Sequence, residues 1–445
     1  MRIVAVIRRE LRLHDNPLFQ DADAHAIIPL FVSDDAPSAG HNENLTSLFA
    51  FALAQLGQCI AALGGRLYSV REAQQEAFFS LARPDLVRFC DDVRPHVRER
   101  NAALVQLLDD RGIPHQTLRD HSLTPIPEQP FTTFARFYKH HFLPSLENEI
   151  LSYPTPRRFV TPAIPVTEAA LPIVVTPASK GWLRTEGEVL GMWAAFIEHH
   201  LADYSASADI PAAGATSRMS PYVGCGIISL RRMFRESRGA SESFVRSLAR
   251  HDYFAQLLAH FPGTPEHALD DSWWHFPWRH DSGAFARWQQ GETGFPLVDA
   301  GMRQLRQEGW LDNRIRMVVA SFLTRDLLVD WRWGEQYFAR QLVDADLAQN
   351  VGNWQWVTGC GGPDSIHYFR VLNPLVQAQR FDPAGLYTRR YLPELRDVPA
   401  AALTRLVRLR QAAPGYPLPM VDLAAARRTF MEIARREVRR PRRRE

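Results

Sequence analysis

Short runs of apolar residues, many of them β-branched, recur through the first quarter of the chain. The runs at 2–7 (RIVAVI) and 26–32 (AIIPLFV) are continuous rather than alternating, a pattern typical of strands buried on both faces of a parallel sheet. Three more strands are expected, at 66–70, at the end of 71–90 and within 114–123. Because helical stretches separate them, the pattern predicts an α/β domain with a doubly wound parallel sheet over residues 1–125.

The first predicted helix, residues 44–63, has apolar residues at helical spacing. Asn44 is its candidate N-cap, and Gly64 and Gly65 end it. No GxGxxG follows the first strand, so the fingerprint of a nicotinamide dinucleotide site is absent. We therefore expect the main cofactor to bind outside this sheet.

Prolines are dense over 126–185 and the periodicity is lost, which predicts an ordered connector. From Glu186 onward the apolar spacing is helical nearly throughout. The helices expected there are 187–203, 227–237, 241–261, 283–290, 296–308, 312–330, 334–343 and 399–412. The sequence thus predicts an all-α C-terminal domain over 186–430. A basic tail, 431–445, follows it and is solvated, disordered or a contact for a polyanion.

The composition is that of a globular protein, with 46% hydrophobic and 23% charged residues in a chain of 445. A net charge of +3 permits a polyanionic partner without demanding one. The four cysteines form no CxxC pair, so neither a zinc site nor a disulfide framework is indicated. No signal peptide is recognisable and no apolar run approaches the roughly 18 residues of a membrane helix. We expect a soluble, cytoplasmic protein without a membrane partner.

Residues 214–222 (GATSRMSPY) place a glycine and several hydroxyls before a predicted helix. Hydroxyls and free backbone N–H groups beside a helix start suit a phosphate or pyrophosphate. A turn rich in Ser and Thr that only caps the helix accounts for the same residues. The pattern leaves both interpretations open.

One predicted helix places Asn313, Arg316 and Met317 within one turn, so that all three can face one cavity. Arg316 can pair with Asp344 or Asp346, which are two residues apart and therefore point in different directions. An ion pair between helices that serves only the structure is an equal alternative.

Tryptophan is frequent, with 11 residues. Trp278, Trp331 and Trp354 lie in three different segments, so spacing alone does not bring them together. Packing in the core is the default for them, and for Trp310 and Trp356 as well.

Several long motifs, in order along the chain, resemble those of the photolyase and cryptochrome family of flavoproteins. They are RRELRLHDNPLF at 8–19, TSRMSPY at 216–222, TGFPLVDAGMRQL at 293–305 with the helix after it, VDADLAQNVGNWQW at 343–356 and FDPAGLYTRRYLPEL at 381–395. The resemblance covers nearly the whole chain. It is nearest to bacterial cyclobutane pyrimidine dimer photolyases of class I or III.

The resemblance implies FAD bound inside the helical domain. The residues implied to hold its phosphates are Tyr204, Thr216, Ser217, Met219 and Ser220. Those implied to surround the isoalloxazine and the ribose are Arg316, Asp344 and Asp346. Asn350 matches the position next to flavin N5, where an amide can hydrogen-bond N5 and help keep the flavin reduced.

The resemblance also implies a tryptophan relay that reduces the flavin under light. Trp354 matches the position nearest the flavin, followed by Trp331 and then by Trp278 toward solvent. Indoles suit this role because they are oxidisable at accessible potentials, and electron tunnelling requires closely spaced relays.

The implied reaction is blue-light-driven electron transfer from reduced FAD to a pyrimidine dimer in UV-damaged DNA, which splits the cyclobutane ring. The dimer must be flipped out of the base stack into a pocket. Residues that match this substrate pocket are Asn313, Met317, Trp356 and Trp310. Candidates for phosphate contacts are Arg314, Arg250 and the C-terminal arginines. The pocket stretch LDNRIRM lacks the two histidines of (6-4) photolyases, which favours cyclobutane dimers.

Three positions of the predicted helix 241–261 depart from the family pattern. Ser247 stands where a lesion-binding Glu is usual, Arg250 where a stacking Trp is usual and His251 where an Arg is usual. Loss of an aromatic side chain that stacks on a base costs ~1–3 kcal/mol of binding energy. A preference for dimers in single-stranded over double-stranded DNA therefore stays open. A cryptochrome-like blue-light photoreceptor without repair activity is one alternative. A (6-4) or other lesion specificity is another.

A second chromophore is expected to be a deazaflavin or absent rather than a folate, because Arg94 stands where the family's folate-contacting Glu is usual. We expect a monomer without an obligate protein partner or a metal.

Overall fold

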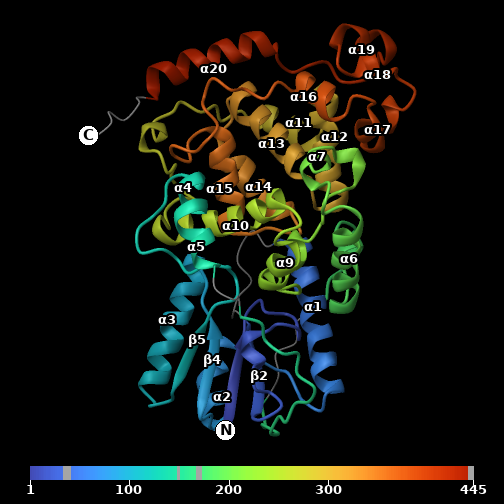
Figure 1. The fold of residues 1–445 in the computed structure, drawn as a ribbon. Coiled ribbons are helices and arrows are strands. Elements are labelled where there is room, and N and C mark those ends of the chain that lie inside the picture. Colours follow the sequence, from blue (N-terminus) through green and yellow to red (C-terminus); the bar gives the residue numbers. More distant parts are fainter. Residues whose placement is uncertain (34–41, 148–150, 167–172, 439–445) are drawn as a thin grey trace. The chain divides into compact units, whose positions relative to one another are not determined.

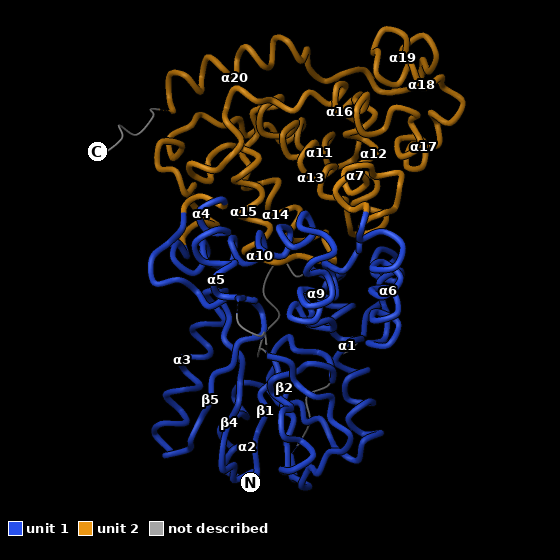
Figure 2. The backbone as a smooth tube through the Cα atoms, in the orientation of Figure 1, with its two compact units in different colours: residues 1–131, 135–202, 217–262 blue, residues 132–134, 203–216, 263–445 orange. Residues whose placement is uncertain are grey.

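The computed structural model describes residues 1–33, 42–147, 151–166 and 173–438. The chain forms two compact units, each built from several segments (Figure 2). Unit 1 comprises Met1–Phe131, Ala135–Ala202 and Ser217–Pro262, and unit 2 comprises Thr132–Phe134, Asp203–Thr216 and Gly263–Glu445. The domain boundaries expected from the sequence stay predictions.

Unit 1 is built on a five-stranded parallel sheet of order β3-β2-β1-β4-β5 (Figure 1). The strands are β1 Arg2–Ile7, β2 Ala26–Ser33, β3 Tyr68–Arg71, β4 Leu86–Cys90 and β5 His115–Leu118. β1 lies in the middle, with Val4 opposite Ile28 on one side and Val87 on the other. Its apolar run is buried on both faces, so the predicted doubly wound sheet is confirmed.

The helices that lie wholly or mostly in unit 1 are α1 Glu43–Ala62, α2 Gln75–Ala82, α3 Pro95–Asp109, α4 Phe134–Phe137, α5 Leu143–Ser145, α6 Glu186–His199, α8 Ser220–Gly224, α9 Leu230–Ser237 and α10 Glu242–His260. The N-cap prediction for α1 is wrong by two residues. Asn42 caps the helix by accepting from the Leu45 N–H at 2.9 Å. Asn44 is buried in the first turn, and its Oδ1 accepts from the Thr176 hydroxyl at 2.6 Å.

α1 is long and apolar enough to span a membrane by length and composition alone, which corrects the expectation that no run approaches that length. Its Leu48, Leu53 and Ile60 are buried, and its Phe49 ring lies 5.7 Å from the Phe31 ring of β2. The core helix of a soluble protein passes the same test.

The loop after β1 forms a buried ionic network within unit 1. Arg12 donates two guanidinium N–H groups to Asp120, at 2.9 and 2.5 Å, and Arg231 of α9 donates to the same carboxylate at 2.9 Å. Burial alone would raise the pKa of Asp120, but the two guanidiniums hold it well below its usual range. His14 contacts Glu186 of α6 at 2.6 Å. This loop, whose sequence is RRELRLHDN, is therefore linked to α6 and α9, and the buried charges of the network are paired with opposite charges.

Unit 2 is helical, as predicted. Its helices are α7 Tyr204–Ser207, α11 Ser282–Gln290, α12 Pro296–Glu308, α13 Asn313–Ser321, α14 Trp331–Gln341, α15 Leu347–Thr358, α16 Pro374–Phe381, α17 Leu386–Tyr391, α18 Ala400–Leu403, α19 Leu406–Ala412 and α20 Leu423–Glu437.

The predicted boundaries in unit 2 need three corrections. The helix expected over 312–330 ends its α-helical part at Ser321, passes into a π-helical segment, Phe322–Asp326, and stops before Leu328, whose φ of 57° no α-helix accommodates. The helix expected over 399–412 is broken into α18 and α19. α15, α16, α17 and α20 lie in the region predicted to be helical nearly throughout, but they were not delimited one by one. α20 includes the first residues of the predicted tail, whereas 439–445 lie outside the described residues.

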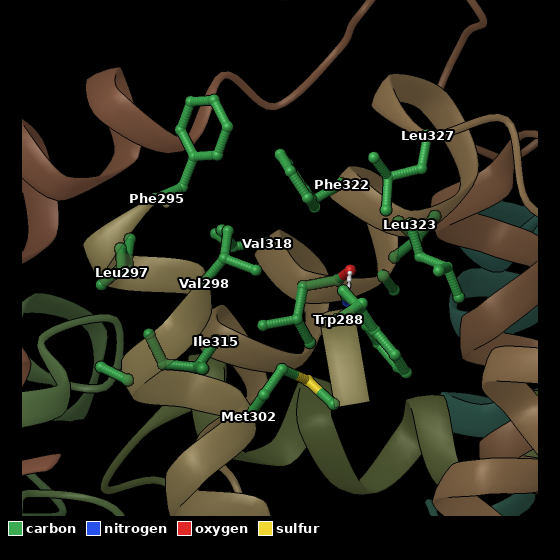
Figure 3. Packing of buried hydrophobic residues seen from close by; sticks show 14 of the residues in the cluster. Trp288, Phe295, Leu297, Val298, Met302, Ile315, Val318, Phe322, Leu323 and Leu327 are labelled. Carbon is green, nitrogen blue, oxygen red and sulfur yellow. Dashed lines mark hydrogen bonds between the residues drawn. The ribbon is translucent and has the colours of Figure 1, made fainter. Parts of the chain in front are cut away.

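The core of unit 2 lies between α11, α12 and α13 (Figure 3). Trp288 of α11 is fully buried, and its indole N–H donates to the Val319 carbonyl at 3.0 Å. Gly301 lets α12 approach α13, since a Cβ there would lie 2.6 Å from Ile315 and 2.9 Å from Val319. This close packing fixes α13, whose first turn carries several of the polar residues considered next.

Candidate functional site

The start of α13 is the centre of a polar cluster in unit 2. Thr216 donates its hydroxyl proton to Asp312 (Oγ1 to Oδ1, 3.1 Å), and Arg314 pairs with Asp209 (Nη2 to Oδ2, 2.5 Å). The Arg314 guanidinium also lies over the Phe381 ring at 4.3 Å. These contacts tie the segment that contains α7 to the first turn of α13.

The residues predicted to hold the flavin phosphates are divided between the two units. Tyr204, half-buried, begins α7 in unit 2 near Thr216 in sequence, whereas Ser217, Met219 and Ser220 belong to unit 1. Met219 is buried, and the Ser217 hydroxyl accepts from its N–H at 3.4 Å. At least one hydroxyl of the cluster thus has a local structural contact, as the capping interpretation expects.

The ion-pair partner of Arg316 is Asp344, at 2.7 Å (Nη2 to Oδ2). Arg316 also donates to the Leu311 carbonyl at 2.9 Å, and its guanidinium lies 6.0 Å from the centre of the Trp310 ring. Asp346 has a different task, because its carboxylate caps α15 by accepting from the Gln349 N–H at 3.1 Å. A guanidinium held by one carboxylate and one carbonyl retains donors for a polar ring edge.

The amide of Asn350 is oriented by Glu335, a residue that the sequence did not suggest. Nδ2 of Asn350 donates to the Glu335 carbonyl at 2.9 Å and to the Glu335 carboxyl at 2.8 Å. Within the described part of the chain, no hydrogen bond to Oδ1 of Asn350 is formed. Glu335 is only 6% exposed, and burial raises its pKa to about 7 in spite of the bond from Asn350. Asn350 therefore presents an acceptor beside a carboxyl that titrates near neutrality.

The three tryptophans of the predicted relay lie in unit 2 in unequal environments. Trp354 and Trp331 are buried, and Trp278 is half-buried. In the described residues, ring contacts run from Trp354 to Phe338 at 5.1 Å and to Trp288 at 6.3 Å, and from Trp278 to other aromatic rings, rather than among the three.

Gly334 of α14 makes room for the ring of Trp354. A Cβ at this position would overlap the six-membered part of the indole. No periodicity distinguishes such a glycine in the sequence, so its role is visible only in the packing.

A loop after α15 fixes Trp356, whose indole N–H donates to the Asp364 carbonyl at 2.9 Å. Arg325, also not foreseen, holds this loop with bonds to four backbone carbonyls, those of Val357, Ile366, His367 and Arg370, at 2.6 to 3.1 Å. Burial lowers the pKa of Arg325 to about 10. In the sequence, the signal for this role is an arginine within a largely apolar run, VVASFLTRDLLV.

The other residues predicted to contact the lesion are placed as follows. Asn313 and Met317 lie one turn apart on α13, with 3.7 Å between Nδ2 and Sδ, and Trp310 is buried. Ser247 and Arg250 lie on α10 in unit 1, where the Ser247 hydroxyl donates to the Ser243 carbonyl of its own helix at 3.1 Å.

The donor set of unit 2 fits a flavin. It offers a guanidinium paired with a carboxylate, an amide whose oxygen accepts no hydrogen bond from the described residues, and several indoles, most of them held by hydrogen bonds or packing. Such a mixture suits a large ring with a polar edge and an apolar face.

Family models match both parts of the chain. Residues 244–436 match the FAD binding domain of DNA photolyase, and residues 3–155 match the model described as DNA photolyase.

Curated relatives and a solved structure agree with these matches. Proteins named deoxyribodipyrimidine photo-lyase from Streptomyces griseus and Alkalihalophilus pseudofirmus are 36% and 31% identical to the chain, each over 96% of it and over 98% and 96% of their own lengths. The crystal structure of a bacterial class III photolyase from Agrobacterium tumefaciens is similar with a TM-score of 0.89 and 30% identity, covering 98% of this chain and 97% of that one.

Proposed function

Because this chain belongs to the DNA photolyase family, we propose that it is a deoxyribodipyrimidine photo-lyase, an enzyme that uses blue light to split cyclobutane pyrimidine dimers in DNA. The chain carries the family's FAD-binding domain. Bound FAD supplies, in its reduced and light-excited form, the electron that opens the cyclobutane ring. Residues of this chain bind the cofactor, keep it reduced and hold the lesion.

The observation that carries the proposal is the orientation of Asn350. Its Nδ2 is committed to Glu335, so Oδ1 would be available to accept a hydrogen bond from a protonated N5 of bound flavin. Reduced flavin carries this proton and oxidised flavin does not, so such an acceptor favours the form that can donate an electron. Arg316 and Asp344 would orient the polar edge of the ring.

The lesion would be held by Asn313, Met317 and Trp356. An amide can hydrogen-bond the base edges, and a thioether and an indole can cover the apolar faces of a flipped dimer. Trp356 is kept in place by its bond to the Asp364 carbonyl.

The test is repair of a thymine dimer in parallel single- and double-stranded oligonucleotides, with photoreduced protein under blue light and a dark control. Repair of both would mean that Ser247 and Arg250 are tolerated in an ordinary photolyase. Repair of single strands alone would mean that Ser247 and Arg250 impair the flipping of a dimer out of a duplex, rather than the splitting of the dimer.

The second candidate is a blue-light photoreceptor without repair activity. It is favoured by Ser247, whose hydroxyl is bonded within α10 where the family has a carboxylate for the lesion. The photoreceptor hypothesis predicts a light-driven change of flavin oxidation state with no loss of dimers from either oligonucleotide. A different lesion specificity is a separate alternative, which the same assay on a (6-4) photoproduct would detect.

Several finer features belong to the same proposal. The protein acts as a cytoplasmic monomer without an obligate protein partner. Its second chromophore is a deazaflavin or absent, which reconstitution with a deazaflavin and with a folate, followed by absorption spectroscopy, would test.

A further inference from the structure

The charge of the chain is concentrated at its C-terminal end. Residues 399–445 contain 12 arginines, no lysine and four acidic residues, a net charge of +8. The rest of the chain has 40 basic and 45 acidic residues, a net charge of −5. The small overall charge therefore conceals a strongly basic end, most of which is folded into α18, α19 and α20 (Figure 1, red).

Seven arginines of these helices and their flanks are exposed. They are Arg405, Arg408, Arg410, Arg427, Arg428, Arg435 and Arg436. Arg436 pairs with Glu437 at 2.6 Å. Within the part of the chain that the structure describes, the other six side chains form no ion pair and no hydrogen bond. Some other arginines of unit 2 are partnered, for example Arg303 by Glu394 at 2.7 Å, whereas Arg306, Arg340 and Arg396 are exposed and, in the described part of the chain, also form no ion pair.

The apolar side of α20 is already buried in unit 2. Phe430 and Ala434 are fully buried, and the Phe430 ring lies 5.8 Å from Phe276 and 5.7 Å from the guanidinium of Arg325. The helix is thus a fixed part of the unit, and its apolar face is unavailable for insertion into a bilayer. What it presents to the outside is charge.

We propose that the exposed arginines of α18–α20 and their flanks, the C-terminal arginine surface, are a second docking surface for the phosphodiester backbone of a nucleic acid. Guanidinium groups bind phosphate oxygens through two parallel hydrogen bonds, which an all-arginine surface exploits better than lysine would. Arg428 and Arg435 are about 10 Å apart along α20, roughly the axial span of three nucleotides of B-DNA. The surface shares no residue with the cluster around Asn313, Met317 and Trp356, which belongs to α13 and α15. That the polyanion is DNA rests on the proposed function.

The experiment measures affinity for an undamaged DNA duplex in the dark at a series of salt concentrations. The variants are R427Q/R428Q/R435Q on α20 and R405Q/R408Q/R410Q at α19. Each phosphate contact that is lost should reduce the slope of log affinity against log salt by ~0.9, so a triple variant should lose roughly one to three units of slope. The control R2Q/R119Q/R157Q removes three exposed arginines of unit 1 and should leave the slope unchanged.

Three results decide whether the C-terminal arginine surface binds DNA. The charge-preserving variant R427K/R428K/R435K should retain most of the slope. Because it changes the same three positions as the glutamine variant, a slope that is lost only with glutamine is due to the lost charge and not to a folding defect. Equal slopes for wild type and both glutamine variants would overturn the proposal. Loss of binding to anionic phospholipid vesicles with an unchanged DNA slope would also overturn it, by assigning the surface to a membrane.

This measurement involves neither a lesion nor light. A protein that repairs no dimer but shows the expected change of slope would contradict the proposed function and leave the C-terminal arginine surface intact. Dimer repair with unchanged slopes would support the proposed function and contradict the role of the C-terminal arginine surface.

Discussion

At the scale of single residues, the chemistry depends on side chains that motifs identify and on partners that they do not. Asn350 was predicted from the motif VDADLAQNVGNWQW, whereas Glu335, which orients it, lies in a helix whose spacing gives no sign of that contact. Similarly, the sequence offered Asp344 and Asp346 as partners for Arg316, and only the structure distinguishes the ion pair from the helix cap. Such pairings depend on how separate helices meet, which local periodicity does not contain.

Glu335→Gln should flatten the pH dependence of the flavin reduction potential near pH 7. The pKa of Glu335 is raised to about 7 by burial, so in the wild type a negative charge develops beside Asn350 as the pH rises through this value and disfavours an anionic reduced flavin. Glutamine keeps an acceptor for Asn350 but does not ionise. Redox titration on either side of pH 7 measures this, with the exposed Glu198→Gln as control. An inflection that persists in Glu335→Gln would contradict the assignment.

Asp326→Asn should make the stability of the protein less dependent on pH between about 4 and 8. Asp326 is 3% exposed, its Oδ2 has no hydrogen-bond partner among the described residues, and burial raises its pKa to about 8. The folded state therefore binds this proton more tightly than the unfolded state, and the stabilisation is lost as the pH rises toward 8. Thermal unfolding at several pH values between about 4 and 8 should show a smaller fall in Tm for the variant than for the wild type. Parallel curves would exclude the effect.

At the scale of elements, type was more predictable than boundaries. The continuous apolar runs at 2–7 and 26–32 specified the two strands that are buried along nearly their whole length, as expected for the middle of a parallel sheet. The helix expected over 312–330 failed at its end, where a π-helical segment and the left-handed Leu328 turn the chain toward α14. Apolar residues continue through that turn, so the hydrophobic pattern gives no signal of it.

Gly334→Ala should damage the packing between α14 and α15. The new Cβ would overlap the Trp354 ring and lie 2.7 Å from Leu323, which an interior helix position cannot absorb without moving the indole. We expect a destabilisation of about 1–3 kcal/mol and slower photoreduction of the flavin. Denaturant unfolding and the rate of flavin reduction under blue light measure the two effects.

The matched control is Gly191→Ala in α6, where a Cβ would meet nothing within 4 Å. An alanine in this helix should stabilise by roughly 0.5–1 kcal/mol, because glycine is the poorer helix former. If Gly334→Ala behaved like this control, the account of Trp354 packing would be wrong.

At the scale of the whole molecule, the sequence predicted the α/β sheet, the helical FAD-binding region and the family, while the grouping into two interleaved units was not foreseen. Contacts between distant segments decide that grouping: Asp203–Thr216 joins unit 2 although the segments on either side of it belong to unit 1. The charge asymmetry was present in the composition. Its meaning depended on seeing that six of the arginines described in α18–α20 and their flanks are exposed and form no ion pair with the rest of the described chain.

The central claim is that this chain repairs cyclobutane dimers with light. The most direct measurement is the loss of dimers from a UV-irradiated single-stranded oligonucleotide mixed with the photoreduced protein, with blue light and in the dark. The account predicts that dimers disappear under blue light only. Persistence of the dimers under blue light, with the flavin shown to be reduced, would contradict it.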